Sequence, residues 1–194
     1  MAAVEDSEVI GKLRSEIKGL PAEWIVLVET PGDRLMEVNT GMLKVLLNEM
    51  DYSGIYITLN RSYENISQLM KGKGIKTNNL FFIDGVTLQN VTPGKVKRED
   101  GVVYIESIRS LTDMTIAVTQ LVPKIESNKK FLFLDSLSTL LLFNSPELIG
   151  RFSHALTTKM RAMGVSGAIV SLPEELDPSF RQMLGALCDK VIKV

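Results

Sequence analysis

The chain has 194 residues, 45% of them hydrophobic, and its 22 basic and 23 acidic residues leave a formal net charge of -1. A single domain of this length buries about 70% of the surface of its unfolded form, so it needs no disulfide or metal to fold. The near-neutral charge excludes a general attraction to nucleic acid or to anionic membranes. One cysteine, Cys188, excludes an intramolecular disulfide, and the apolar runs are too short to span a membrane. We therefore expect a soluble, cytoplasmic protein.

The first predicted element is an amphipathic helix within residues 1–20, because apolar residues recur there at helical spacing with charges between them. Such a helix packs either on its own domain, residues 21–194, or on a partner protein. The sequence leaves both alternatives open.

The rest of the chain alternates strands with helices. Apolar runs predict six buried strands, at residues 24–29, 54–60, 80–84, 130–135, 165–172 and 188–194. Helices are predicted between them, with N-caps at Asp33, Ser62, Ser110 and Ser145. Residues 85–104 are turn-rich and are expected to form a hairpin or a mobile loop. Continuous apolar strands that alternate with helices predict a three-layer α/β/α domain with a mostly parallel sheet.

Polar residues end several predicted strands, at the edge where open α/β sheets bind ligands. They are Glu29, Thr30, Asn60, Asp84, Asp135, Ser136 and Ser171. Asp84 and Asp135 have two interpretations. They either converge on a divalent cation, which prefers oxygen ligands, or each caps a following turn or helix. Spacing alone favours capping, and Asp135 is the weak candidate for a metal ligand.

The sequence FLFLDSLSTLLL at 131–142 is an apolar run interrupted by Asp135 and Ser136. It resembles the Walker B segment of the RecA superfamily, and more narrowly of the KaiC-like ATPases, which would make Asp135 and Ser136 part of that motif. GIYITLNRSYENISQLMKGKGI at 54–75 is similar to the second strand and helix of the family, and GVSGAIVSL with LCDKVIKV resembles its late strands. The resemblance covers Trp24 to Val194 and implies a RecA-like sheet of the P-loop NTPase type.

The resemblance also identifies a degenerate phosphate loop (Walker A motif). KaiC-like ATPases read G-x-P-G-x-G-K-T there, and this chain has ETPGDRLM at residues 29–36. The degenerate nucleotide-loop positions are Thr30, Pro31, Gly32, Asp33, Arg34, Leu35 and Met36. Leu35 replaces the lysine that neutralises phosphate charge, and Met36 replaces the hydroxyl that ligates Mg²⁺. Pro31 and Gly32 keep only the turn.

Charged residues around this loop also differ from those of an active site. Arg34 could grip a phosphate, but its spacing to Glu37 favours an ion pair with that residue, or with Glu29. The carboxylates Glu29, Asp33 and Glu37 lie at or near the helix N-terminus, where they would take the place of a bound anion.

The end of the second strand lacks a catalytic base. The resemblance places there the glutamates with which active members activate water, whereas this chain has Leu59, Asn60 and Arg61. An enzymatic activity is therefore not expected from the family's mechanism.

Three hypotheses follow. The first is a non-hydrolysing KaiC/RecA-like domain, a pseudo-ATPase that serves as an interaction or regulatory module. It would act by self-association or by pairing with a protein partner such as an active paralogue. No ATP or Mg²⁺ cofactor is expected for it. The second is a metal-dependent enzyme or nucleotide-binding protein that uses the edge formed by Asn60, Asp84 and Asp135. The third is weak nucleic-acid binding through residues 95–98, where Lys95, Lys97 and Arg98 are followed by acidic residues.

Overall fold

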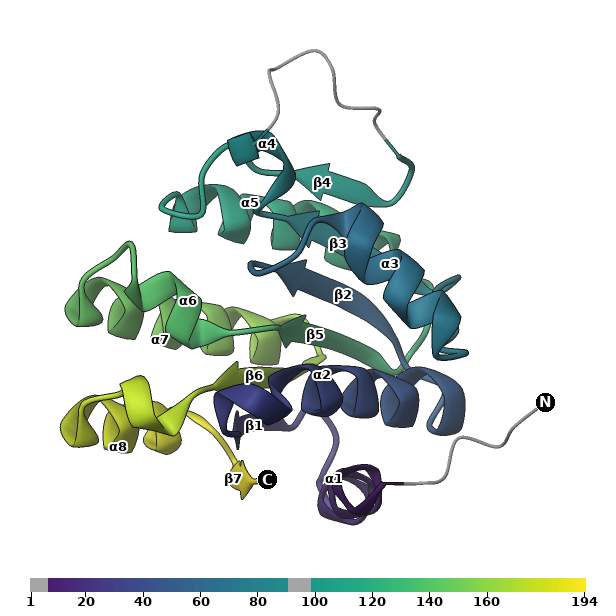
Figure 1. Cartoon of the computed structure of the whole chain (residues 1–194), viewed down its shortest axis with the longest axis horizontal. Coiled ribbons are helices and arrows are strands. Elements are labelled where there is room, and N and C mark those ends of the chain that lie inside the picture. The colour runs from purple at the N-terminus through teal and green to yellow at the C-terminus, as the bar shows by residue number, and fades with distance from the viewer. Residues whose placement is uncertain (1–6, 91–98) are drawn as a thin grey trace.

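The strands form one sheet in which every neighbouring pair is parallel (Figure 1). The computed structural model describes residues 7–90 and 99–194. Within them the sheet has seven strands in the order β4-β3-β2-β5-β6-β1-β7. The strands are β1 (Ile25–Glu29), β2 (Ser53–Thr58), β3 (Leu80–Asp84), β4 (Val102–Tyr104), β5 (Lys130–Leu134), β6 (Val165–Ser171) and β7 (Lys190–Lys193). The predicted α/β class with a mostly parallel sheet is confirmed.

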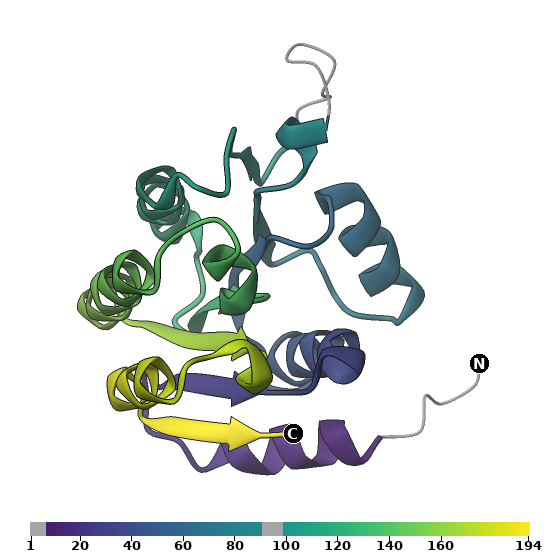
Figure 2. The same ribbon diagram turned by 60° about the vertical axis from the view of Figure 1, so that its left-hand side comes forward.

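Helices cover both faces of this sheet, which gives three layers (Figure 2). The α-helices are α1 (Glu8–Lys18), α2 (Leu35–Leu43), α3 (Tyr63–Gly72), α4 (Thr87–Asn90), α5 (Leu111–Leu121), α6 (Leu137–Leu141), α7 (Pro146–Ala162) and α8 (Pro178–Leu187). A six-residue π-helical stretch, Lys44–Glu49, continues α2. One face carries α1, α2 and α3, and the other carries α5, α7 and α8. No helix in the described part of the chain is long and apolar enough to cross a membrane.

The strands are buried on both faces because their side chains alternate between two cores. In β1, Val26 and Val28 pack in the cluster that includes α1, α2 and α3, whereas Ile25 and Leu27 pack in the cluster that includes α5, α7 and α8. All five residues of β1 are buried. This two-sided burial explains why the strands read as continuous apolar runs.

Three of the four predicted N-caps are confirmed. Ser62, Ser110 and Ser145 each accept a hydrogen bond at 3.3–3.4 Å from the main-chain N–H three residues on. The fourth prediction is wrong, because Asp33 lies inside a 3₁₀ turn, Gly32–Arg34, that runs directly into α2. Arg34 occupies the cap position of α2 and makes no side-chain cap bond. Pro31, with an extended backbone, holds the cap position of this turn, two residues before Asp33.

The leading helix α1 packs on its own chain. Its buried side chains are Val9, Ile10, Leu13 and Ile17, and they lie in or beside the core that contains α2. Gly41 in α2 allows the close approach, because a Cβ added there would lie 3.1 Å from Ile10 and 3.5 Å from Leu13. The apolar side of α1 is therefore occupied within the domain.

The turn-rich stretch 85–104 contains two elements that the sequence did not predict. Thr87–Asn90 form one turn of helix, α4, and Val102–Tyr104 form β4, which pairs in parallel with β3. Residues 91–98 lie outside the described part, and with them the basic residues Lys95, Lys97 and Arg98 of the nucleic-acid hypothesis.

Candidate functional site

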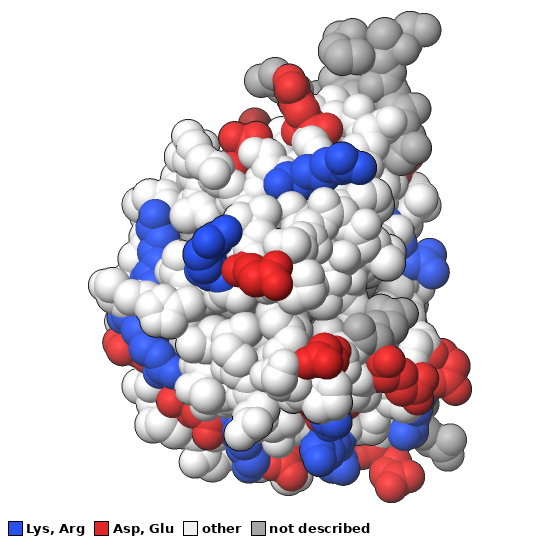
Figure 3. All heavy atoms as spheres, turned by 90° about the vertical axis from the view of Figure 1, so that its left-hand side faces the viewer, with Lys and Arg blue, Asp and Glu red and all other residues white. Residues whose placement is uncertain are grey.

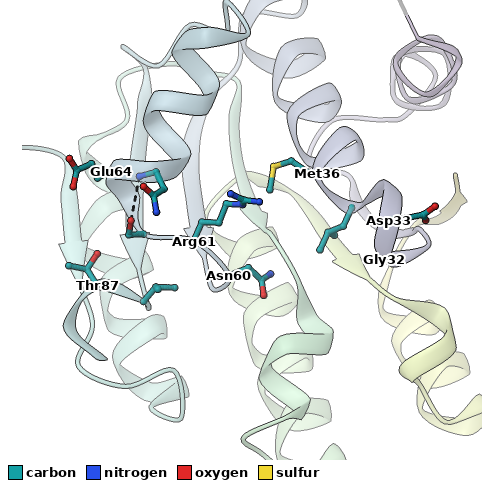
Figure 4. Close-up of a pocket in the computed structure, with 11 residues that line it drawn as sticks. Gly32, Asp33, Met36, Asn60, Arg61, Glu64 and Thr87 are labelled. Carbon is teal, nitrogen blue, oxygen red and sulfur yellow. Dashed lines mark hydrogen bonds between the residues drawn. The ribbon is translucent and has the colours of Figure 1, made fainter. Parts of the chain in front are cut away.

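A pocket of about 850 Å³ opens at the carboxyl edge of the sheet, between the N-terminal ends of α2 and α3 (Figure 4). Gly32, Leu35 and Met36 line it from the loop after β1 and from the start of α2. Asn60 and Arg61 line it from the segment after β2. The structure thus brings the loop positions and the end of the second strand to one cavity, of the size that small-molecule sites usually have.

Asp135 follows β5, is 3% exposed, and has both carboxylate oxygens occupied by protein donors. Oδ1 accepts the main-chain N–H of Leu59 at 3.0 Å. Oδ2 accepts the hydroxyls of Tyr56 and Thr58, each at 3.3 Å. These bonds tie β5 to the end of β2. Ser136 caps α6 by accepting a hydrogen bond from the N–H of Thr139 at 3.4 Å. Its hydroxyl, like the carboxylate of Asp135, is therefore bound to the protein's own groups.

Burial dominates the electrostatics of this network. Burial raises the pKa of Asp135 from its ordinary 3.8 to about 7, although the bonds from Leu59, Tyr56 and Thr58 oppose that rise. Burial also raises the pKa of Tyr56 well above its usual value, and the nearby Asp135 adds to this. Near neutral pH the raised pKa leaves Asp135 partly protonated.

Asp84 ends β3 and fastens the two segments beside it. Oδ1 accepts the N–H groups of Val86 and Thr87 at 2.7 and 2.8 Å. Oδ2 accepts the N–H of Tyr63, the first residue of α3, at 2.7 Å and the Thr87 hydroxyl at 2.5 Å. Four donors therefore surround a carboxylate that has no exposed surface.

The edge cluster does not converge on one point. Asp84 and Asp135 end strands on opposite sides of β2, and the side-chain oxygen of Asn60 accepts the Thr139 hydroxyl at 2.8 Å. Within residues 7–90 and 99–194 there is no group of three or more His, Cys, Asp or Glu that could hold a metal ion. Each of the three side chains instead holds a different segment of the edge.

The loop after β1 contains one ion pair that the sequence indicated and one that it did not. Arg34 Nε lies 3.8 Å from Glu37 Oε2, the alternative favoured by their spacing. Glu29 does not pair with Arg34. Its carboxylate is 3% exposed and receives two hydrogen bonds from the guanidinium of Arg181 in α8. Glu29 therefore does not point to the N-terminus of α2 as a substitute anion.

Sequence reasoning missed the roles of Arg181 and Arg61. Arg181 is 152 residues from Glu29, so no local pattern could reveal the pair. Arg61 was noted only because it stands where a glutamate base would be expected. Its position directly after an apolar strand was the signal that its side chain would lie at the ligand-binding edge.

The face of the molecule on which the strands end is largely uncharged. Figure 3 views the molecule from the side where the strands end, and uncharged surface covers much of this face while many of the charged side chains lie toward its rim. Exposed large hydrophobic residues occur on this side at the junction of α6 and α7, namely Leu142, Phe143 and Leu148. The guanidinium of Arg109 lies 5.9 Å from the centre of the Phe143 ring.

The parallel sheet and its strand order place this chain in the same fold class as two archaeal proteins of known structure, one of them KaiC-like. The KaiC-like protein PH0186 from the hyperthermophilic archaeon Pyrococcus horikoshii OT3 superposes with a TM-score of 0.62 at 16% identity, over 90% of this chain and 72% of that one. The uncharacterized protein PH0321 from Pyrococcus horikoshii, solved in complex with an unknown peptide, superposes with a TM-score of 0.64 at 14% identity, over 94% and 82%. At such identities the likeness shows the fold alone.

The chain itself belongs to DUF7504, a family of unknown function, whose model matches residues 43–194. No curated protein matches the sequence.

Proposed function

We propose that this protein is a non-hydrolysing KaiC/RecA-like domain that acts as an interaction or regulatory module. The observation that carries the proposal is the chemistry at the pocket wall formed by α2. Leu35 and Met36 line the cavity at the positions where the resemblance requires a lysine and a hydroxyl. Neither side chain can neutralise a phosphate or ligate Mg²⁺.

The neighbouring carboxylates support the same conclusion. Asp135, the Walker B-like residue, directs both oxygens at three protein donors and has a pKa raised to about 7 by burial. A magnesium site needs ionised, accessible oxygens. Asn60 and Arg61 supply no general base at the end of β2. The residues at this edge thus fit Mg²⁺ and a triphosphate poorly.

The first test is the thermal unfolding of the purified protein with Mg²⁺ and ATP, ADP or GTP. We expect no rise in the unfolding midpoint, whereas a ligand at 100 times its dissociation constant would add about 2.7 kcal/mol to the stability. A clear rise with any of these nucleotides would contradict the proposal. Stabilisation by Mn²⁺ or Mg²⁺ alone, abolished in Asp135→Ala, would favour the metal-dependent enzyme instead.

An interaction role is supported by the exposed hydrophobic residues between α6 and α7. Leu142 is 74% exposed, and Phe143 and Leu148 are each 39% exposed. Adjacent exposed apolar side chains are a common mark of a protein contact. The structural neighbour PH0321 was solved with a peptide bound, which is consistent with a binding role for this fold. We propose that this junction mediates self-association of the chain.

Light scattering over a range of protein concentrations tests the self-association. The wild type is expected to form oligomers as concentration rises, and the double substitution Leu142→Ser with Phe143→Ser is expected to shift it to monomer, because two apolar contacts are lost. Ile116→Ser is the matched control, since Ile116 is 48% exposed but lies on α5. A wild type that stays monomeric at every concentration would refute self-association.

A further inference from the structure

The segment that joins β2 to α3 is fastened to three different elements. Leu59 donates its N–H to Asp135 after β5, and the Thr139 hydroxyl of α6 donates to Asn60. Tyr63 donates its N–H to Asp84 at the end of β3. Thr58 Oγ1 lies 2.5 Å from the main-chain oxygen of Arg61, so its single proton is shared between that oxygen and Asp135 Oδ2. A short connection held at so many points has a fixed backbone.

Arg61 projects from the middle of this fastened segment. Its exposed side chain extends across the pocket toward Met36 in Figure 4. The guanidinium makes no hydrogen bond or ion pair with any residue in the described ranges 7–90 and 99–194. Five N–H donors therefore remain available in the cavity, on a main chain that does not need to rearrange.

The acidic residues of the pocket wall do not neutralise Arg61. Asp33 and Glu64 line the cavity from its opposite sides, and in Figure 4 both side chains point away from the guanidinium. Neither forms an ion pair with Arg61, whereas Arg34 on the neighbouring turn, outside the pocket lining, pairs with Glu37. Arg61 is thus the basic residue of the pocket lining that still lacks an anion.

The rest of the lining restricts the ligand. Leu35, Met36 and Val86 contribute apolar surface to the same lining as Arg61. The two carboxylates at the rim repel negative charge, so a carboxylate or a phosphate monoester, with one or two charges, is tolerated far better than a triphosphate, with about four. An oxyanion attached to an apolar or aromatic body satisfies both the guanidinium and the apolar wall.

We propose that this pocket binds a small molecule that carries one oxyanion, a carboxylate or a phosphate monoester, and that Arg61 grips this group with its guanidinium. The apolar body of the ligand lies against Leu35 and Met36. The inference adds a ligand class to the proposed regulatory module and does not depend on the absence of ATP hydrolysis. Nucleotide binding by the wild type would overturn the proposed function, whereas the Arg61 result is judged with different ligands.

The test is an amide NMR titration of the full chain with benzoate and, separately, with phenyl phosphate. At least one of the two is expected to bind and to shift the amide signals of Arg61, Ser62 and Val86 in the wild type. Arg61→Gln keeps a polar side chain but loses the charge, and it is expected to weaken binding by about 10- to 100-fold. Arg34→Gln is the matched control and is expected to bind as the wild type does.

The outcomes separate the alternatives. Binding of benzoate alone assigns a carboxylate, and binding of phenyl phosphate alone assigns a phosphate monoester. Absence of binding by both ligands would refute the proposal. It would also be refuted if Arg34→Gln weakened binding as much as Arg61→Gln, because the effect would then come from general charge. An unchanged unfolding midpoint of Arg61→Gln ensures that lost binding is not lost folding.

Discussion

Asp135→Asn is expected to remove a pH dependence worth about 4 kcal/mol from the free energy of unfolding between pH 4 and pH 7. Burial raises the pKa of Asp135 from 3.8 to about 7 in the folded chain. The folded state therefore binds the proton more tightly than the unfolded state. This contribution to stability is fully present below about pH 4 and is lost as the pH rises through 7. Asparagine has no such proton to lose.

Urea unfolding at several pH values between about 4 and 8 measures this effect as the difference between the wild type and Asp135→Asn. As the pH rises, the free energy of unfolding of the wild type is expected to fall relative to that of Asp135→Asn. The fall is expected to level off above the pKa that Asp135 has in the folded state. Asp113→Asn, which removes an exposed carboxylate on α5, is the control. Parallel pH profiles for wild type and Asp135→Asn would show that Asp135 has the same pKa in the folded and unfolded states, against the burial argument.

Leu13→Ala is expected to destabilise the protein by about 3 kcal/mol, within the range seen for fully buried leucines. The Leu13 side chain has no exposed surface and packs where Gly41 lets α1 approach α2. Truncation removes apolar contacts and leaves a cavity between the two helices. The same substitution in a helix that only served a partner would have little effect on the isolated chain.

Chemical denaturation with Lys12→Ala as the control tests this expectation. Lys12 neighbours Leu13 on α1 but is exposed, and its substitution is expected to change stability by less than about 0.5 kcal/mol. Equal stabilities of Leu13→Ala and the wild type would mean that α1 detaches from the domain in solution and is free to bind elsewhere.

The fold could be predicted from the sequence because its main signals are local. Two-sided burial makes the core strands continuous apolar runs, and Ser62, Ser110 and Ser145 each cap a helix from within its first turn. The strand β4 could not be predicted, since its three residues, Val102–Tyr104, form an apolar run too short to distinguish a strand from part of a loop, and they are only half-buried. The prediction that Asp33 caps α2 was wrong because a 3₁₀ turn and an α-helix begin with the same residue types.

The candidate site was less predictable because its geometry depends on contacts across the sheet. The polar residues after the apolar runs correctly indicated the carboxyl edge of the sheet, and they placed Asp84 and Asp135 at strand ends. It could not reveal that β2 lies between them, or that α8 brings Arg181 to Glu29. Whether a polar residue at such an edge faces a ligand or fastens a neighbouring segment is decided by strand order and helix placement.

The position of β1 within the sheet has a consequence for synthesis on the ribosome. β1 is synthesised before β6 and β7, yet these are the two strands with which it pairs in the described part of the chain. Until then, the apolar residues of β1, α1 and α2 cannot be buried against the completed sheet. Non-local parallel pairing of this kind slows folding and exposes aggregation-prone surface. We therefore expect the nascent chain to need protection by chaperones until β6 and β7 have been released.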